Sequence, residues 1–204
     1  MSERANRSLP AEYFDALYAR DPDPWRFETS DYERGKYDAT LAALPCARYA
    51  RALEVGCSIG VLTADLAPRC EALLALDAAE APLRRARERL AGQPHVAFAL
   101  AGVPAAWPED AAPFDLILLS EVVYYLSPPD VERLAARVAA SLAPGGDVLL
   151  VHWTGETDYP LSGDEAVERF VAASPGLEVR RAERAERYRL DLLQAPGLRP
   201  PAGR

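Results

Sequence analysis

From residue 51 onward, short apolar runs alternate with segments of helical spacing, and this alternation limits the folds that the chain can adopt. Strands that are joined through helices pair in parallel, so the pattern predicts an α/β protein with a doubly wound, mostly parallel sheet. The segment 177–193 predicts two more strands, one of them antiparallel at the sheet edge, which makes seven in all, although its Ala-Glu-Arg repeats are also compatible with a helix. The expected strands are a run ending at Val55, then 72–76, 96–100, 114–119, 147–153 and the pair within 177–193, and the expected helices between them are 59–66, 80–91, 129–142 and 164–173.

Two further helices, 10–19 and 32–43, are expected before the first strand. The first has its aromatic residues at helical spacing, and the sequence D-P-D-P at 21–24 ends it because a residue before proline avoids the α region. A chain of 204 residues suits one domain, so we expect a single domain over 1–204. Within it, 10–45 is expected to form an N-terminal helical lid and 50–193 the core.

Composition narrows the classes of partner. The net charge is −8, which argues against a nucleic-acid substrate because phosphate binding needs clustered lysine and arginine. The three cysteines form no C-x-x-C pair, so we predict neither a metal site nor a disulfide framework. No apolar run approaches the length of a membrane span and the first ten residues are polar, so we expect a cytoplasmic protein without a membrane partner.

The stretch 53–63 (L-E-V-G-C-S-I-G-V-L-T) predicts a buried strand, a tight turn and the start of a helix. Gly56 and Gly60 lack a Cβ, so the backbone there can bend sharply and a ligand can approach closely. The dinucleotide pattern G-x-G-x-x-G is absent, and no lysine follows as in a P-loop. Glu54 would repel an anion and attract an amino group, so the turn predicts a cationic ligand without phosphate at the carboxyl edge of the strand.

Asp77 closes the second expected strand, about one helix and one strand after Gly60. In a doubly wound sheet, an acid at this place accepts hydrogen bonds from the hydroxyl groups of a ligand's ribose. A solvated loop carboxylate is the alternative, and the glycine turn in front of it favours the ribose role.

Two further candidates follow later strands. The run 114–119 is almost wholly apolar, as in a strand covered on both faces, and it delivers Ser120 and Glu121 to its carboxyl end. A partly desolvated Glu121 suits the orientation or deprotonation of an amine, and capping of the next turn is the alternative. His152 ends the fifth strand and is a second candidate base, with a packed structural histidine as the alternative.

Four features occur in order: E-x-G-x-x-x-G at 54–60, the acid at 77, F-D-L-I-L-L-S-E at 114–121 and L-A-P-G-G-D-V-L-L at 142–150. This set resembles the class I S-adenosylmethionine-dependent methyltransferases. D-P-W at 23–25, Y-E-R-G-K-Y at 32–37 and S-E-V-V-Y-Y-L at 120–126 resemble motifs of the nodulation protein S family of N-methyltransferases. The resemblance spans about 23–193 and implies a Rossmann-like fold with S-adenosyl-L-methionine as its cofactor.

The resemblance also implies which residues serve the cofactor. In that family the D-P-W segment folds over the cofactor, so Trp25 is expected to cover it, unless it only anchors the lid, and Arg26 to pair with its carboxylate. Gly102 stands where many relatives have an aspartate that accepts from the adenine amine, and Val103 is expected to pack on the adenine. The complete set of expected cofactor contacts is Trp25, Arg26, Glu54, Gly56, Cys57, Gly60, Asp77, Ala78, Gly102, Val103 and Ser120.

Methyl transfer to a small-molecule acceptor follows from the resemblance. Because some family members methylate an amino group of a chito-oligosaccharide precursor, we expect an amine, such as that of an amino sugar or oligosaccharide, with Glu121 and His152 as catalytic residues. Three alternatives stay open on the same fold: O-methylation of a small metabolite, an NAD-linked oxidoreductase and a non-catalytic binding protein. The missing dinucleotide pattern argues against the oxidoreductase.

Overall fold

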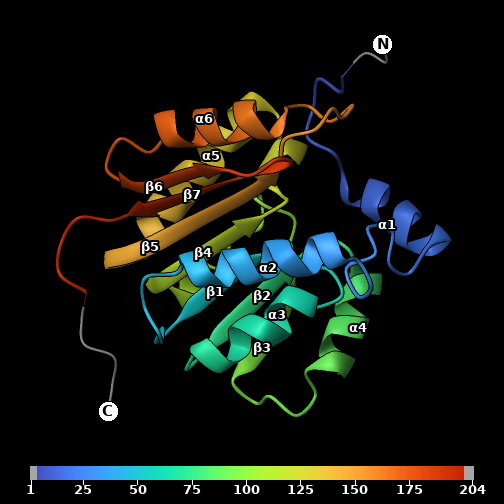
Figure 1. Ribbon diagram of the computed structural model, residues 1–204, viewed down its shortest axis with the longest axis horizontal. Coiled ribbons are helices and arrows are strands. Elements are labelled where there is room, and N and C mark those ends of the chain that lie inside the picture. The colour runs from blue at the N-terminus through green and yellow to red at the C-terminus, as the bar shows by residue number, and fades with distance from the viewer. Residues whose placement is uncertain (1–3, 200–204) are drawn as a thin grey trace. The chain divides into compact units, whose positions relative to one another are not determined.

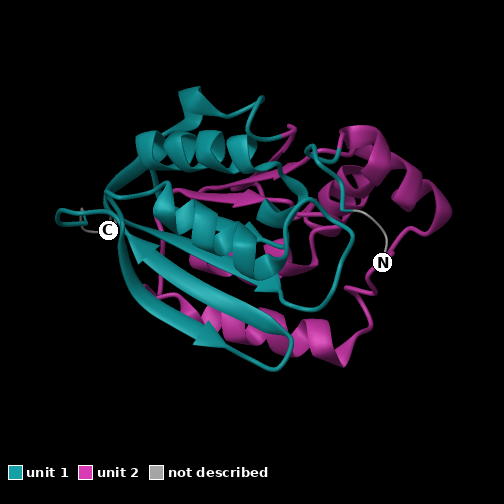
Figure 2. Ribbon diagram, turned by 90° about the horizontal axis from the view of Figure 1, so that it is seen from above, with its two compact units in different colours: residues 1–9, 103–201 teal, residues 10–102, 202–204 magenta. Residues whose placement is uncertain are grey.

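The computed structural model describes residues 4–199, and in them the chain forms two compact units. Residues 10–102 make up the first, called here the N-terminal unit. Residues 4–9 and 103–199 make up the second, called the C-terminal unit (Figure 2). The seven strands form one sheet in the order β3-β2-β1-β4-β5-β7-β6. This confirms the expected mostly parallel α/β sheet of seven strands.

The N-terminal unit carries three parallel strands in the order β3-β2-β1. Leu53, Leu73, Ala75 and Leu76 of these strands are fully buried, and α4 covers them with its apolar face, on which Leu83 is also buried. The elements of this unit are α1 (Ala11–Arg20), α2 (Asp31–Ala43), β1 (Ala52–Val55), α3 (Val61–Leu66), η1 (Ala67–Arg69), β2 (Leu73–Asp77), α4 (Glu80–Arg89) and β3 (Val96–Leu100).

The C-terminal unit pairs β4 with β5 in parallel, and β7 lies antiparallel between β5 and β6. Helices α5 and α6 lie side by side in Figure 1. The middle of β4 and of β5 is buried without interruption, which agrees with the apolar runs in the sequence. The elements are η2 (Glu109–Ala111), β4 (Phe114–Ser120), η3 (Val123–Tyr125), α5 (Pro128–Ser141), β5 (Leu142–Trp153), α6 (Gly163–Ala172), β6 (Glu178–Arg184) and β7 (Tyr188–Gln194).

Local sequence explains where several helices begin. Ser30 accepts a hydrogen bond from the Glu33 amide and starts α2. Ser162 and Glu165 form a reciprocal capping box at the start of α6. Helix α5 begins with a proline in its first turn, where the missing N–H costs nothing. No helix within residues 4–199 is long and apolar enough to cross a lipid bilayer.

Two elements begin two or more residues away from the predicted position, whereas the others begin within one residue of it. The helix expected from residue 59 begins at Val61, because Gly60 has a left-handed backbone and cannot belong to it. The strand expected from residue 147 begins at Leu142, and the P-G-G sequence lies inside it as an irregularity. The pairing of β4 with β5 skips there, from Phe114 opposite Leu142 to Leu116 opposite Asp147.

Candidate active site

The glycine turn between β1 and α3 contains three residues with a left-handed backbone. Gly56 has φ 81°, Ser58 has φ 51° and Gly60 has φ 76°. The amides of Gly56 and Cys57 donate to the carbonyl oxygen of Leu76 at 2.8 and 2.9 Å. The turn is therefore fixed at the carboxyl ends of two neighbouring parallel strands, as the sequence predicted.

Close packing on α4 makes a glycine necessary at position 60. A Cβ on Gly60 would lie 2.9 Å from the Cβ of Ala86, in addition to the strain of its positive φ. The Cys57 side chain is buried in an apolar cluster with Ala75 and Leu83. Of Cys57, only the backbone is therefore left to face a ligand.

Asp77 is the last residue of β2, and its carboxylate is held in place by backbone groups. One oxygen accepts from the amide of Ser58 at 2.8 Å, and the other accepts from the amide of Ala79 at 3.0 Å. Burial raises the pKa of Asp77 to about 6, and these hydrogen bonds oppose the rise. The carboxylate is thus oriented, is partly exposed beside Ala78, and can accept further hydrogen bonds.

Glu54 is the most unusual charged group of the N-terminal unit. Its side chain is 2% exposed, and neither its Oε2 nor the Oγ1 of Thr63 has a hydrogen-bond partner among the described residues. Burial, together with the smaller effect of the negative charge of Asp77, raises the pKa of Glu54 to about 7. Thr63 opposes the rise although it completes no hydrogen bond to Oε2. An unpaired buried carboxylate oxygen favours a cationic ligand at this place.

Gly102 follows the end of β3 in the N-terminal unit. The amide of Ala101 donates to the carbonyl of Asp77 at 2.8 Å, so the residues after β3 lie next to the end of β2. A Cβ on Gly102 would meet no atom within 4 Å, so the position has room for a side chain. Val103, the first residue after this unit, is partly buried. Its contact with adenine and that of Gly102 stay predictions.

The D-P-W-R-F segment forms a turn that Asp23 caps. The carboxylate of Asp23 accepts from the amides of Phe27 at 2.8 Å and Glu28 at 3.0 Å. Within the turn, Arg26 has a left-handed backbone with φ 58° and an exposed side chain, and Trp25 stacks on Phe27 with ring centroids 5.6 Å apart. The turn therefore holds Trp25 and Arg26 in one defined arrangement.

Tyr18 contacts two of the predicted site motifs, although the sequence pattern placed it only among the aromatic residues of the first helix. Its hydroxyl forms a 2.5 Å hydrogen bond with the Ser58 hydroxyl, and its ring meets the edge of Trp25 at 5.8 Å. Burial raises its pKa well above the ordinary value, so the phenol stays protonated. Tyr18 thus connects the D-P-W-R-F turn to the glycine turn. In the sequence, the position of this tyrosine three residues before D-P-D-P was the feature that could have indicated its contact with the turn.

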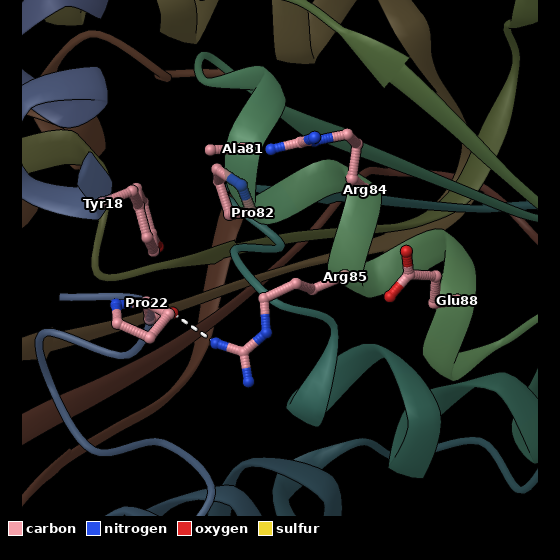
Figure 3. Close-up of a pocket in the computed structure, with 7 residues that line it drawn as sticks. All are labelled: Tyr18, Pro22, Ala81, Pro82, Arg84, Arg85 and Glu88. Carbon is pink, nitrogen blue, oxygen red and sulfur yellow. Dashed lines mark hydrogen bonds between the residues drawn. The ribbon is translucent and has the colours of Figure 1, made fainter.

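A pocket of about 280 Å³ lies between the segment after α1 and the outer face of α4 (Figure 3). None of the residues predicted to bind the cofactor lines it. In Figure 3, Arg85 reaches from α4 to the carbonyl oxygen of Pro22 and donates a hydrogen bond to it. The lining residues are Tyr18, Pro22, Ala81, Pro82, Arg84, Arg85 and Glu88.

In the C-terminal unit, Ser120 ends β4 and Glu121 follows with a left-handed backbone, φ 56°. The Oε2 atom of Glu121 accepts from the Tyr124 hydroxyl at 2.5 Å and from the Trp153 amide at 2.9 Å. Burial, followed by the charge of Glu121, raises the pKa of Tyr124 well above its ordinary value. A half-buried carboxylate is therefore fixed where β4 and β5 end.

His152 is completely buried next to this carboxylate. Its Nε2 accepts from the Val123 amide at 3.0 Å, and its ring meets the edge of Tyr124 at 5.3 Å. The lone pair of Nε2 is therefore engaged, which supports the structural alternative for His152. Where the Glu121 group lies relative to the glycine turn stays a prediction.

Backbone strain marks three of the predicted motifs. Within residues 4–199, the residues other than glycine that have positive φ are Arg26, Ser58 and Glu121. Each costs free energy that surrounding contacts must offset, and such residues concentrate at functional sites. Their positions agree with the D-P-W-R-F, E-x-G-x-x-x-G and S-E-V-V-Y-Y-L motifs.

The comparison with protein families tests the resemblance that the sequence motifs indicate. A family described as Nodulation protein S (NodS) matches residues 14–149, well over half of the 204 residues. The chain belongs to the NodS family. This confirms the resemblance seen in the sequence, and the matched range includes every predicted cofactor contact but not His152.

Individual relatives agree with the family. Nodulation protein S of Rhizobium tropici is 35% identical over 129 residues, which cover 62% of this NodS-family chain and 53% of that protein. The chain spans only 53 to 59% of the length of the NodS proteins that it matches.

Two crystal structures share the fold. A candidate methyltransferase from Pseudomonas syringae is 39% identical, with a TM-score of 0.69, and the match covers 80% of this chain and 98% of that one. The N-methyltransferase NodS from Bradyrhizobium japonicum WM9, in complex with S-adenosyl-L-homocysteine, has a TM-score of 0.77 at 23% identity, covering 91% and 98%. The fold of this chain is that of the class I methyltransferases.

Proposed function

We propose that this NodS-family chain transfers a methyl group from S-adenosyl-L-methionine to an amine of a small molecule. Besides family membership, one observation supports the proposal: the buried oxygen Oε2 of Glu54 that lacks a hydrogen-bond partner among residues 4–199. Such an oxygen is costly unless a cation binds it. The ammonium group of this cofactor is such a cation, whereas the pyrophosphate of a dinucleotide would be repelled.

The residues of the N-terminal unit fit the parts of this cofactor. Glu54 would hold the ammonium group, and the oriented carboxylate of Asp77 would accept from the ribose hydroxyls. Arg26 would pair with the cofactor's carboxylate, and Trp25 would exclude water above it. When bound, the cofactor supplies a methyl group already activated by the positive sulfur.

The C-terminal unit supplies the group that prepares the acceptor. An amine attacks only in its neutral form, so the ammonium form must first lose a proton. Glu121 would bind the ammonium, take that proton and release it to solvent after the product leaves. Tyr124 and the Trp153 amide hold its carboxylate in place. His152, which accepts from Val123, would position the turn that carries Tyr124.

The negative charge of Glu121 also argues for an amine acceptor over the O-methylation alternative. An acidic acceptor would bring its own negative charge next to Glu121 and be repelled, whereas an ammonium would be attracted. The overall charge of −8 acts in the same direction on approaching molecules. We therefore favour an amine, including the amine of an amino sugar.

The deciding experiment is a methyl-transfer assay with mass detection against a panel of amines, amino sugars, alcohols and carboxylic acids. We expect a methylated amine together with S-adenosyl-L-homocysteine. Glu121→Gln should lower kcat by about 100-fold, the usual share of a general base, and change cofactor affinity less than twofold. Glu183→Gln, on the exposed strand β6, is the control and should behave as the native protein.

Two outcomes would contradict the proposal. If alcohols or carboxylic acids were methylated and no amine were, the acceptor would not be an amine. Native turnover in Glu121→Gln would remove Glu121 from the mechanism while leaving the cofactor assignment intact.

A further inference from the structure

Helix α4 carries two arginines one turn apart that hold a single carboxylate. Arg85 donates to Oε1 of Glu28 at 3.0 Å, and Arg89 donates to the same oxygen. Glu28 comes directly after the D-P-W-R-F turn. These two arginines bind another part of the N-terminal unit.

Each arginine also holds a backbone carbonyl. Arg85 donates to the carbonyl of Pro22, on the other side of the turn from Glu28 (Figure 3). The Nε of Arg89 donates at 3.0 Å to the carbonyl of Ile59, inside the glycine turn. Arg89 therefore connects the glycine turn with the D-P-W-R-F turn, and Arg85 fixes the latter at both ends.

The ion pairs are partly withdrawn from water, which increases their strength. The side chains of Glu28, Arg85 and Arg89 are 35%, 33% and 31% exposed. Exposed single pairs contribute little, but two arginines on one carboxylate, with further hydrogen bonds to carbonyls, form a network. Such a network restrains the segment between its anchors more than a single pair would.

The segment between the anchors needs this restraint. It holds Arg26 in a left-handed backbone conformation, which relaxes unless neighbouring contacts maintain it. Asp23 caps the turn from within, and the two arginines fix it from outside. The side chains of Trp25 and Arg26 lie between the anchors at Pro22 and Glu28.

We propose that Glu28, Arg85 and Arg89 form a clamp that positions Arg26 and Trp25 for the amino-acid end of the cofactor. The inference rests on the proposed function and adds three positioning residues to it. They touch neither substrate nor cofactor, and they act by fixing the D-P-W-R-F turn relative to the glycine turn.

Glu28→Gln tests the clamp, because it removes the charge and keeps the shape. Affinities for S-adenosyl-L-homocysteine and for 5′-methylthioadenosine, which lacks the amino-acid end, are measured by calorimetry. We expect the first to fall about five- to tenfold, corresponding to about 1 kcal/mol, and the second to change less than twofold. Glu80→Gln is the control, since it removes the exposed pair with Arg87 on the same helix and should alter neither affinity.

A double substitution tests whether Glu28 affects ligand affinity through Arg26. In an Arg26→Gln background, Glu28→Gln should cost clearly less affinity than in the native protein, because one of the two residues that it positions is gone. Sodium chloride screens the ion pairs of the clamp. A rising salt concentration should therefore weaken the binding of S-adenosyl-L-homocysteine more steeply in the native protein than in Glu28→Gln.

The possible results distinguish a failure of the clamp from a failure of the proposed function. Equal loss of both ligands, no loss of either, or a full additive loss in the Arg26→Gln background would each overturn the clamp while leaving the proposed function standing. A native protein that binds no S-adenosyl-L-homocysteine would overturn the proposed function and the clamp together.

Discussion

Glu54 lies in the interior of the N-terminal unit with a carboxylate oxygen that no described hydrogen bond satisfies. Its pKa is about 7 in the folded protein, against an ordinary value of 4.5, because burial disfavours the charged form. Between these values the folded state binds more protons than the unfolded state. The stability that the protonated carboxyl contributes is therefore complete below about pH 4.5 and lost as the pH rises through 7.

Glu54→Gln should accordingly stabilise the ligand-free protein at pH 8 by about 2 kcal/mol and change its stability little at pH 4. Urea unfolding at both pH values measures this. The same variant should bind S-adenosyl-L-homocysteine more weakly, because the ammonium loses its partner. Lower stability than the native protein at pH 8, or unchanged affinity, would contradict this role for Glu54.

A substitution at Gly102 is expected to strengthen the binding of S-adenosyl-L-homocysteine, whereas Glu54→Gln is expected to weaken it. Because a side chain has room there, Gly102→Asp should fold normally and bind S-adenosyl-L-homocysteine a few-fold more tightly, by accepting from the adenine amine. Calorimetry with S-inosylhomocysteine, which lacks that amine, is the matched comparison and should show no gain. Gly102→Ala controls for the added Cβ. If Gly102→Asp bound both ligands more tightly, the adenine amine would not be the group that the new carboxylate contacts.

At the scale of single residues, sequence reasoning placed acids at strand ends, where the structure also has them, but it missed contacts that aromatic side chains make across the fold. Asp77 was predictable because a strand end fixes where its carboxylate lies. Tyr18 was not, because its hydrogen bond to Ser58 depends on how α1 packs against a turn 40 residues later in the chain. Arg89 was missed for the same reason, since a charged helix face gives no sign of its partner.

At the scale of elements, the turn η3 and the end of β5 act together through the Tyr124 hydroxyl. Tyr124→Phe removes a donor that holds the Glu121 carboxylate in place, so the carboxylate is oriented less well toward an acceptor. We expect kcat to fall about three- to tenfold, which is the contribution of one hydrogen bond, and cofactor affinity to stay unchanged. Tyr49→Phe, at a buried tyrosine of the N-terminal unit, is the control. Equal kcat values in the two variants would limit Tyr124 to packing.

The expected elements were close to those observed, and the two boundary errors share a cause. Gly60 and Gly145 both have positive φ, which periodicity of apolar residues does not reveal. In the first case the turn extends into the predicted helix. In the second case Gly145 lies beside Arg199, whose guanidinium donates to its carbonyl at 2.8 Å, so residues from the far end of the chain allow β5 to start early.

At the scale of the whole molecule, strand number and direction followed from the alternation of apolar runs with helices. The division into two compact units did not, because it depends on contacts between segments distant in sequence. Most of the predicted cofactor contacts lie in the N-terminal unit, whereas Val103, Ser120 and the pair Glu121 and His152 lie in the C-terminal unit. That separation was invisible in motifs read along the chain.

Among the contacts that hold residues 195–199 to the sheet is one ion pair with a buried partner. Arg199 pairs at 2.5 Å with Asp147, which is fully buried in the middle of β5. Arg199→Ala should lower the free energy of unfolding by about 3 kcal/mol, because it leaves a buried carboxylate without its cation. Urea unfolding measures the loss, Arg187→Ala on an exposed pair is the control, and adding Asp147→Asn should restore part of the stability. A loss equal to that of the control would contradict this role.

Strand β6 ends the sheet, and all seven of its residues are exposed. An open edge of this kind invites a neighbouring molecule to add a strand, and repeated addition leads to fibres. The side chains of β6 include charges of both signs, from Glu178, Arg180, Arg181, Glu183 and Arg184. Any approaching strand would have to desolvate these charges, so the same edge that completes the fold also keeps one molecule from polymerising with the next.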